Sequence, residues 1–415
     1  MSAGSYKHAV SVSGQVFFCA APIRLDAYDG CQFGCVYCFS RRRARRWASK
    51  GVHAANSKAL ELRLKRVAAG SYLSALDEFL AMRVPIQLGG LHDPFTPREK
   101  SLGVTYQLLR ILCESNYPTL ISTKGEFVVD TEYIALLRQM NVVVRFSAAG
   151  VAERFRAAID RRCASFERTL EKIATLTARG IKTTLRIQPV IPGFEEDALR
   201  MTHRAALAGA SQVSFEYLKL PKETLRTDVQ IMSGVIGFDI LRHMKAIGLA
   251  EQGWDYALAP RAKRSFIITA RRDCHENGLS FGAGDTEFIP WSDGDGCCGS
   301  ASHNFHNSTQ FRANYVGAIK SALTGPHHEV RFHSIEERWS PIRPVSTYLD
   351  SRSRTGVSHH GTSDWISMVA TRWNGGLGPY SPAFFDGVRW TGKVDAKGFR
   401  IYDATSLASS LASTE

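Results

Sequence analysis

The feature that most constrains the fold is a repeated alternation of short apolar runs and amphipathic stretches between residues 24 and 222. The runs have the length of buried strands, and the stretches between them have helical periodicity. We predict strands near residues 24–28, 84–90, 119–123, 142–147, 182–189 and 212–218. We predict helices over residues 56–67, 71–82, 100–114, 130–139, 164–179 and 197–208. Repeated βα units of this kind predict an α/β fold with a parallel sheet.

Three cysteines lie close together just after the first predicted strand, in a turn that contains Gly34: Cys31, Cys35 and Cys38. Thiolates at this spacing can bind three irons of a cubane iron–sulfur cluster and leave the fourth iron open for chemistry. Zinc is the alternative metal, but a structural zinc site needs four protein ligands, usually in CxxC pairs. The three cysteines alone leave both metals open.

The residues around these cysteines favour iron. Three residues separate Cys31 from Cys35, two separate Cys35 from Cys38, and Tyr37 directly precedes the last cysteine. This spacing resembles the cluster loop of the radical S-adenosylmethionine (SAM) enzymes. The resemblance implies that Cys31, Cys35 and Cys38 hold a [4Fe-4S] cluster and that SAM binds its open iron. It also implies an external flavodoxin- or ferredoxin-like electron donor, and cleavage of SAM to methionine and a 5′-deoxyadenosyl radical that abstracts a substrate hydrogen. The implied fold is a partial (βα)6 TIM-like barrel with ligands at the carboxyl ends of its strands.

Candidate cofactor-binding residues follow several of the predicted strands. Gly89 and Gly90 close the second strand, where the resemblance implies contact with the SAM amino group; a tight turn is the structural alternative. Lys124 ends the third strand and can pair with the methionyl carboxylate, although a lone lysine is usually a surface residue. Ser147 on the fourth strand and Arg186 on the fifth are candidates for a ribose or carboxylate contact, or else face solvent.

Two further polar residues lie on these strands. Arg145 shares the side of Ser147, because side chains alternate along a strand. Glu216, on the sixth strand, is a candidate substrate or adenine-side contact.

Several strand-end residues together resemble the spore photoproduct lyase-like branch, which includes DNA repair photolyases. They are Gly89–Gly90, Asp93–Pro94, residues 122–125 and Ser147. The resemblance covers roughly residues 18–222 and continues more weakly to about residue 300. In one respect the chain departs from the branch. The lyase has a hydrogen-donor cysteine near the end of its second strand, and residues 84–97 contain no cysteine. The resemblance therefore does not extend to thymine-dimer repair by that route.

A second group of cysteines lies in a glycine-rich part of the chain: Cys274, Cys297 and Cys298. We predict an auxiliary role for them, either as ligands of a second iron–sulfur cluster or as a thiol that donates a hydrogen atom or an electron. Adjacent cysteines rarely bind one metal without strain, and free cysteines are often simply buried, so a structural role is the alternative. The remaining cysteines are predicted to be structural: Cys113 continues the apolar pattern of residues 106–112, and Cys19 and Cys163 have no cysteine partner nearby.

The composition bears on the partner and the compartment. The net charge of +13 and the arginine-rich run at residues 41–46 suit an anionic partner such as a nucleic acid, a nucleotide or an acidic peptide. A solvated helix face is the alternative, since only Trp47 is near enough to stack on a base. Nine cysteines in 415 residues, with no disulfide-like pattern, predict a reducing cytoplasm. The sequence contains no run of 18 apolar residues, so we predict no transmembrane helix.

We predict three parts of the chain. Residues 1–225 form the partial-barrel domain, residues 226–304 extend it and carry the second cysteine group, and residues 305–415 form a C-terminal α+β appendage of unknown role. The appendage carries four tryptophans and the pairs His327–His328 and His359–His360. Two other functions stay open: a radical SAM tailoring enzyme for a peptide or small natural product, and a metal-stabilised nucleic-acid-binding protein.

If the partner is a nucleic acid, its binding should weaken steeply with salt, because phosphate contacts release counterions. Charge reversal of the run should then lower the affinity equally for unrelated oligonucleotides, because phosphate contacts carry no sequence information. The residues to change are Arg41, Arg42, Arg43, Arg45 and Arg46. Fluorescence anisotropy with labelled DNA and RNA at several salt concentrations measures both effects. No salt-dependent binding by the unmodified chain would instead favour a peptide or small-molecule substrate.

Overall fold

The computed structural model describes residues 4–6, 9–38, 40, 53–222, 225–252, 255–299, 305–346, 364–375 and 381–414. The arginine-rich run at residues 41–46, Trp47 and the pair His359–His360 lie outside the described residues.

An eight-stranded sheet forms the centre of the molecule, with the strand order β14-β10-β9-β8-β7-β6-β3-β2. Its strands are β2 (Val10–Val12), β3 (Ile23–Leu25), β6 (Ile86–Leu88), β7 (Thr119–Thr123), β8 (Val142–Gly150), β9 (Lys182–Val190), β10 (Gln212–Tyr217) and β14 (Ser280–Ala283). All neighbouring strands are parallel except β2 and β3. Within the described residues the edge strands β14 and β2 do not pair, so the sheet is an open barrel. The predicted α/β fold and its six parallel strands are confirmed.

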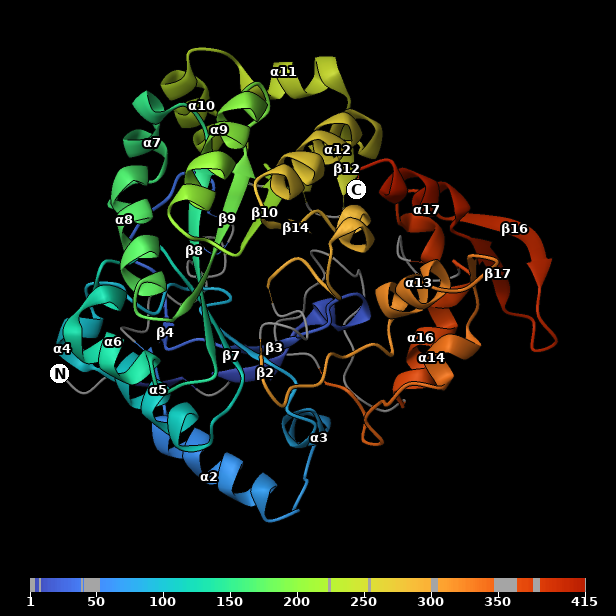
Figure 1. Cartoon of the computed structure of the whole chain (residues 1–415), viewed down its shortest axis with the longest axis horizontal. Coiled ribbons are helices and arrows are strands. Elements are labelled where there is room, and N and C mark those ends of the chain that lie inside the picture. Colours follow the sequence, from blue (N-terminus) through green and yellow to red (C-terminus); the bar gives the residue numbers. More distant parts are fainter. Residues whose placement is uncertain are drawn as a thin grey trace.

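Helices cover the outer face of this sheet. They are α2 (Ser57–Ala68), α3 (Ala75–Ala81), α4 (Glu99–Leu102), α5 (Val104–Glu114), α6 (Thr131–Leu137), α7 (Glu153–Ile159), α8 (Phe166–Thr177), α9 (Glu195–Leu207) and α12 (Pro260–Glu276). Side-chain caps begin three of them: Asn56, Ser74 and Ser165 accept hydrogen bonds from the amides of Ala59, Asp77 and Arg168, respectively. Figure 1 shows α4 to α9 as a layer outside strands β7 to β10. The opposite, inner face of the sheet is left for a site.

Smaller elements flank the sheet. Strands β1 (Gly4–Tyr6), β5 (His53–Ala55) and β4 (Tyr28–Asp29) form a second sheet beside the cysteine loop. Between β10 and α12 lie β11 (Leu220–Pro221), α10 (Leu225–Ile236), α11 (Ile240–Ile247), β12 (Leu249–Gln252) and β13 (Asp255–Leu258). No helix in the described parts of the chain has the length and apolar character that crossing a membrane requires.

The C-terminal part is a mixed α+β unit, as predicted. It contains α13 (Tyr315–Leu323), β15 (Glu329–Val330), α14 (His333–Glu336), α16 (Trp365–Trp373), β16 (Arg389–Val394), β17 (Arg400–Asp403) and α17 (Thr405–Ala412). It packs on the N-terminal 3-10 helix through rings: Phe17 lies 5.1 Å from Trp365 and 6.2 Å from Tyr315, centre to centre. In Figure 1 this unit lies on the other side of the sheet from α4 to α9. The division into parts at residues 225 and 304 stays a prediction.

The buried carboxylate of Glu99 joins several of these elements. It accepts hydrogen bonds from the hydroxyl of Tyr28, from that of Tyr133 (2.6 Å), and from the amides of Thr105 (2.9 Å) and Tyr106 (3.0 Å). Burial and this carboxylate raise the pKa of both tyrosines, so both hydroxyls keep their protons and donate. Glu99 thereby fixes β4, which leads into the cysteine loop, against α5 and α6.

Replacement of Glu99 by glutamine should lower the free energy of unfolding by about 2–3 kcal/mol. The reason is that the N–H groups of the glutamine side chain would face hydroxyl and amide groups that now donate to the carboxylate. Glu114→Gln is the matched control, since Glu114 is exposed and lies 3.5 Å from Arg110. The control should change the unfolding free energy by less than about 0.5 kcal/mol. Urea unfolding measures both, and equal effects of the two substitutions would contradict the role of Glu99.

Candidate functional site

The three cysteines of the N-terminal loop lie together after β4. Cys35 is buried, Cys31 and Cys38 are half-buried, and the amide of Cys38 donates to the carbonyl of Cys35 (3.2 Å). Gly34 has φ +70°, a conformation that favours glycine, and a Cβ there would have no atom within 4 Å. The turn at Gly34 thus brings the three cysteines into one short loop. Burial and the Asp93 carboxylate raise the pKa of Cys31 to about 12, so a bound metal would have to displace its proton.

A buried ion pair holds this loop against the sheet. The Asp160 carboxylate accepts a hydrogen bond from the hydroxyl of Tyr37, another from the amide of Ala149 (2.9 Å), and pairs with Lys124 at 3.1 Å. Lys124 also donates to the carbonyl of Ser147 (3.1 Å). Although burial opposes ionisation of both groups, their mutual attraction lowers the pKa of Asp160 and raises that of Lys124. The pair thus stays charged, and it ties the aromatic residue of the loop to the ends of β7 and β8.

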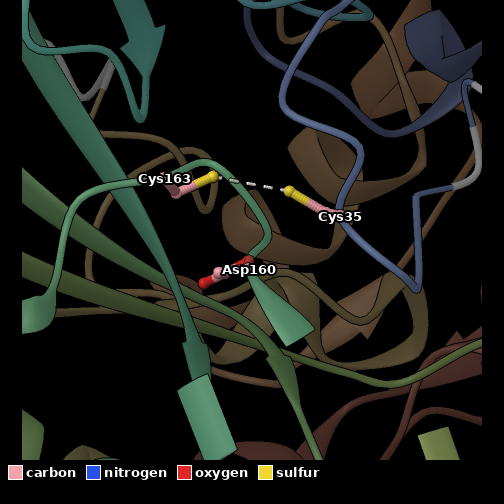
Figure 2. Close-up of side chains that lie close together, drawn as sticks. All are labelled: Cys35, Asp160 and Cys163. Atoms are coloured by element: carbon pink, nitrogen blue, oxygen red, sulfur yellow. Dashed lines mark hydrogen bonds between the residues drawn. The ribbon is translucent and has the colours of Figure 1, made fainter. Parts of the chain in front are cut away.

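Cys163 lies against this loop, which corrects the prediction that it has no cysteine partner. Its sulfur is 3.7 Å from that of Cys35, and Figure 2 shows the two sulfurs turned toward each other above Asp160. The cause is α7, which was not predicted: the chain after it folds back over the loop, and Val36 donates to the carbonyl of Ile159 (3.0 Å).

Cys35, Asp160 and Cys163 are close enough to hold a single ion, with ligand atoms within 4.8 Å of one another. The carboxylate of Asp160 is, however, already engaged by Lys124, Tyr37 and the amide of Ala149. This group is therefore a poor zinc site. The cluster cysteines need not approach one another so closely, because the thiolates of a cubane bind different irons.

The glycines at the end of β6 have a clear packing role. A Cβ on Gly89, which has φ +84°, would lie 2.5 Å from the carbonyl oxygen of Ser122, and one on Gly90 would lie 2.9 Å from Arg24. Asp93 then joins β6 to β7 by accepting from the hydroxyl of Thr123 (2.8 Å) and the amide of Lys124 (2.6 Å). The tight turn is thus confirmed, and the contact of Gly89 and Gly90 with SAM stays a prediction.

A second site lies on the inner face of the sheet, in a cavity of about 40 Å³. Side chains from the 3-10 helix η1 (Gly14–Phe17) and the residues just after it, from the sheet, and from the chain after β14 line it; they include Gln15, Cys19, Gln87, Arg145, Arg186, Glu216, Cys297 and Cys298. Arg186 forms an ion pair with Glu216, which also accepts from Gln188 (2.7 Å) and Lys219 (2.8 Å). Arg186 therefore faces this cavity, and its predicted ribose or carboxylate contact stays a prediction.

The structure separates the second cysteine group. Cys297 and Cys298 line the cavity, but Cys274 is fully buried in α12 and does not line it. Cys274 continues the buried stripe of Phe266, Ile267 and Ala270 along that helix, so it packs into the core. The third cysteine at the cavity is instead Cys19, and the prediction that it has no cysteine partner was wrong. No local sequence signal links Cys19 to residues so distant in the chain.

Comparison with known proteins agrees with this geometry. Residues 26–206 match the family model of the radical SAM superfamily. The chain therefore contains a radical SAM domain. A spore photoproduct lyase variant, and another variant with dinucleoside spore photoproduct, are both 14% identical, with a TM-score of 0.50, covering 67% of this chain and 80% of their own. At that identity the likeness shows a shared fold. A search of curated proteins found no match. Members of the radical SAM superfamily use a [4Fe-4S] cluster and SAM.

The contact between Cys35 and Cys163 gives a prediction for the iron-free protein. Treatment with diamide should join these two thiols in a disulfide, with two electrons and two protons passing to diamide, because their sulfurs already lie 3.7 Å apart. Peptide mapping by mass spectrometry would detect the cross-linked peptide. Cys113, which is half-buried and in contact with no other cysteine among the described residues, is the internal control and should stay free. Recovery of Cys35 and Cys163 as separate alkylated peptides would contradict the geometry.

Proposed function

We propose that Cys31, Cys35 and Cys38 hold the cluster at which this enzyme cleaves SAM, and that the resulting radical abstracts hydrogen from a nucleic acid or nucleotide. The observation that carries the proposal is the loop itself, whose three thiols lie at the carboxyl ends of the strands beside a buried ion pair. When bound and reduced by an external flavodoxin- or ferredoxin-like donor, the cluster supplies the electron that cleaves SAM.

In this proposal, the residues around the cysteine loop bind SAM and hold the loop in position. Tyr37 is fixed by Asp160, so the loop cannot swing away from the strand ends. Gly89, Gly90 and Ser147 lie at strand ends on the same side and are the proposed contacts of SAM. Lys124 keeps its predicted place beside them, but its bonds to Asp160 and Ser147 give it a positioning role as well.

The substrate class rests on weaker support. The net charge of +13 favours an anionic partner. One lyase structure of the same fold holds a dinucleoside spore photoproduct, which makes a nucleic acid or nucleotide our first proposal. Residues 84–97 lack a cysteine, whereas three other cysteines line the inner cavity. Any thiol chemistry of this chain would therefore use a cysteine of the cavity and not one near the end of the second predicted strand. A peptide or small natural product is the second proposal.

Single replacement of Cys31, Cys35 or Cys38 by alanine should abolish 5′-deoxyadenosine formation, because each removes one of three proposed protein ligands of the cluster. Cys113→Ala is the control and should leave the rate unchanged, since Cys113 lies in α5 on the outer layer. Chromatography of anaerobic reactions with SAM and dithionite measures the product. A variant of the loop that forms 5′-deoxyadenosine at the unmodified rate would remove that cysteine from the ligand set.

Visible spectra test the remaining alternative, a metal-stabilised nucleic-acid-binding protein. Broad absorbance that bleaches with dithionite is expected after anaerobic reconstitution. A colourless zinc protein would overturn the proposed function.

A further inference from the structure

Arg145 is a buried cation without a carboxylate partner. It lies on β8, is 2% exposed, and its guanidinium donates to the hydroxyl of Ser122 at 2.7 and 3.2 Å. No carboxylate of the described residues lies within ion-pair distance of it. A buried charge without a counter-charge is costly, so its position inside the cavity calls for an explanation.

The neighbouring charges do not compensate Arg145, because they already balance one another. Arg186 pairs with Glu216, Lys219 lies between Glu216 and Asp285, and Lys263 pairs with both Asp285 and Glu287. Three cations and three carboxylates therefore form one connected network next to the cavity. No carboxylate of this network is left over for Arg145.

The Arg145 guanidinium keeps its charge in this position. Burial and Arg186 lower the pKa of Arg145 to about 10, which still leaves it protonated near neutral pH. At neutral pH, then, the cavity contains a positive charge that no carboxylate of the described residues pairs with.

The cavity lies on the same face of the sheet as Ser147, a proposed contact of SAM. Ser147 follows Arg145 by two residues on β8, so both side chains lie on the same face of the sheet. Ser147 is the register partner of Arg186 on β9, and its carbonyl accepts from Lys124. A ligand held at Arg145 would therefore lie on the same face of the sheet as the proposed SAM contact Ser147, two residues before it on β8.

We propose that this cavity binds an anionic group of the substrate, a carboxylate or a phosphate, with Arg145 as its main contact and Arg186 beside it. The inference rests on the proposed function, since it describes the substrate of the same reaction. Roughly 10–15 Å³ suffices for one water, so a cavity of about 40 Å³ accepts a head group of a few atoms and not a whole substrate. The rest of the substrate would extend toward the strand ends.

Anion-dependent stability tests the inference without any turnover. The thermal unfolding midpoint of the reconstituted protein should be measured in sodium acetate, in sodium phosphate and in acetamide, all at matched ionic strength. Acetamide is the uncharged control. Either acetate or phosphate, or both, should raise the midpoint of the unmodified chain and of Arg145→Lys. Arg145→Met should lose this rise, with affinity for the anion falling about tenfold or more. Arg110→Met removes an exposed cation and should respond like the unmodified chain.

The same variants separate a binding role from a structural one. Without added anion, Arg145→Met should unfold at the same or a higher temperature than the unmodified chain, because it removes an uncompensated buried charge. A strong loss of stability in Arg145→Met, or an equal anion effect in Arg145→Met and Arg110→Met, would overturn the inference. Protection by acetate alone would assign a carboxylate, and protection by phosphate alone would assign a phosphate.

Iron analysis and SAM cleavage on the same preparations complete the test. A second cluster in the cavity would raise the iron content above four per chain, with the excess lost in the double variant Cys297→Ser, Cys298→Ser; that result would overturn the anion assignment. Cleavage of SAM without any anion effect would overturn this inference alone. An anion effect without SAM cleavage would overturn the proposed function and leave the anion site standing.

Discussion

The geometry of the site depends on one buried carboxylate, that of Asp160. It joins the cysteine loop through Tyr37, the end of β7 through Lys124 and the end of β8 through the amide of Ala149. Removal of one partner from a buried ion pair costs about 3–5 kcal/mol, so the loop is fixed by a contact that the chain cannot easily rearrange. A cluster whose open iron must meet SAM at the strand ends requires this kind of fixed position.

The open sheet explains why the interior carries so many charges. A closed barrel would fill its interior with apolar side chains. Here β8, β9 and β10 present Arg145, Arg186 and Glu216 to the inside, and the chain after β14 closes the space with Cys297 and Cys298. Below this polar layer, Ala21, Leu120, Val143, Cys298 and Phe305 form a small apolar cluster. The polar side chains of the cavity and this apolar cluster thus share Cys298.

The sequence predicted the elements whose signal is local. The six parallel strands and most outer helices follow from apolar runs and helical periodicity, and the cysteine loop follows from its spacing. Strand β14 was missed because Ser280–Ala283 is short and contains Gly282, and α7 was missed because it is short and rich in charge. Cys274 was misplaced although the periodicity of Phe266, Ile267 and Ala270 already indicated a buried helix face. The contact of Cys163 with Cys35, and the place of Cys19 in one cavity with Cys297 and Cys298, depend on tertiary folding and leave no local pattern.

The central claim is that three thiols of one loop hold a cluster with one open iron. Electron paramagnetic resonance of the anaerobically reconstituted, dithionite-reduced protein, recorded before and after addition of SAM, tests it most directly. The account predicts about four irons per chain, the signal of a reduced [4Fe-4S] cluster, and a change in that signal when SAM binds the open iron. A cluster signal that SAM leaves unchanged, or a protein that binds zinc and no iron, would contradict it.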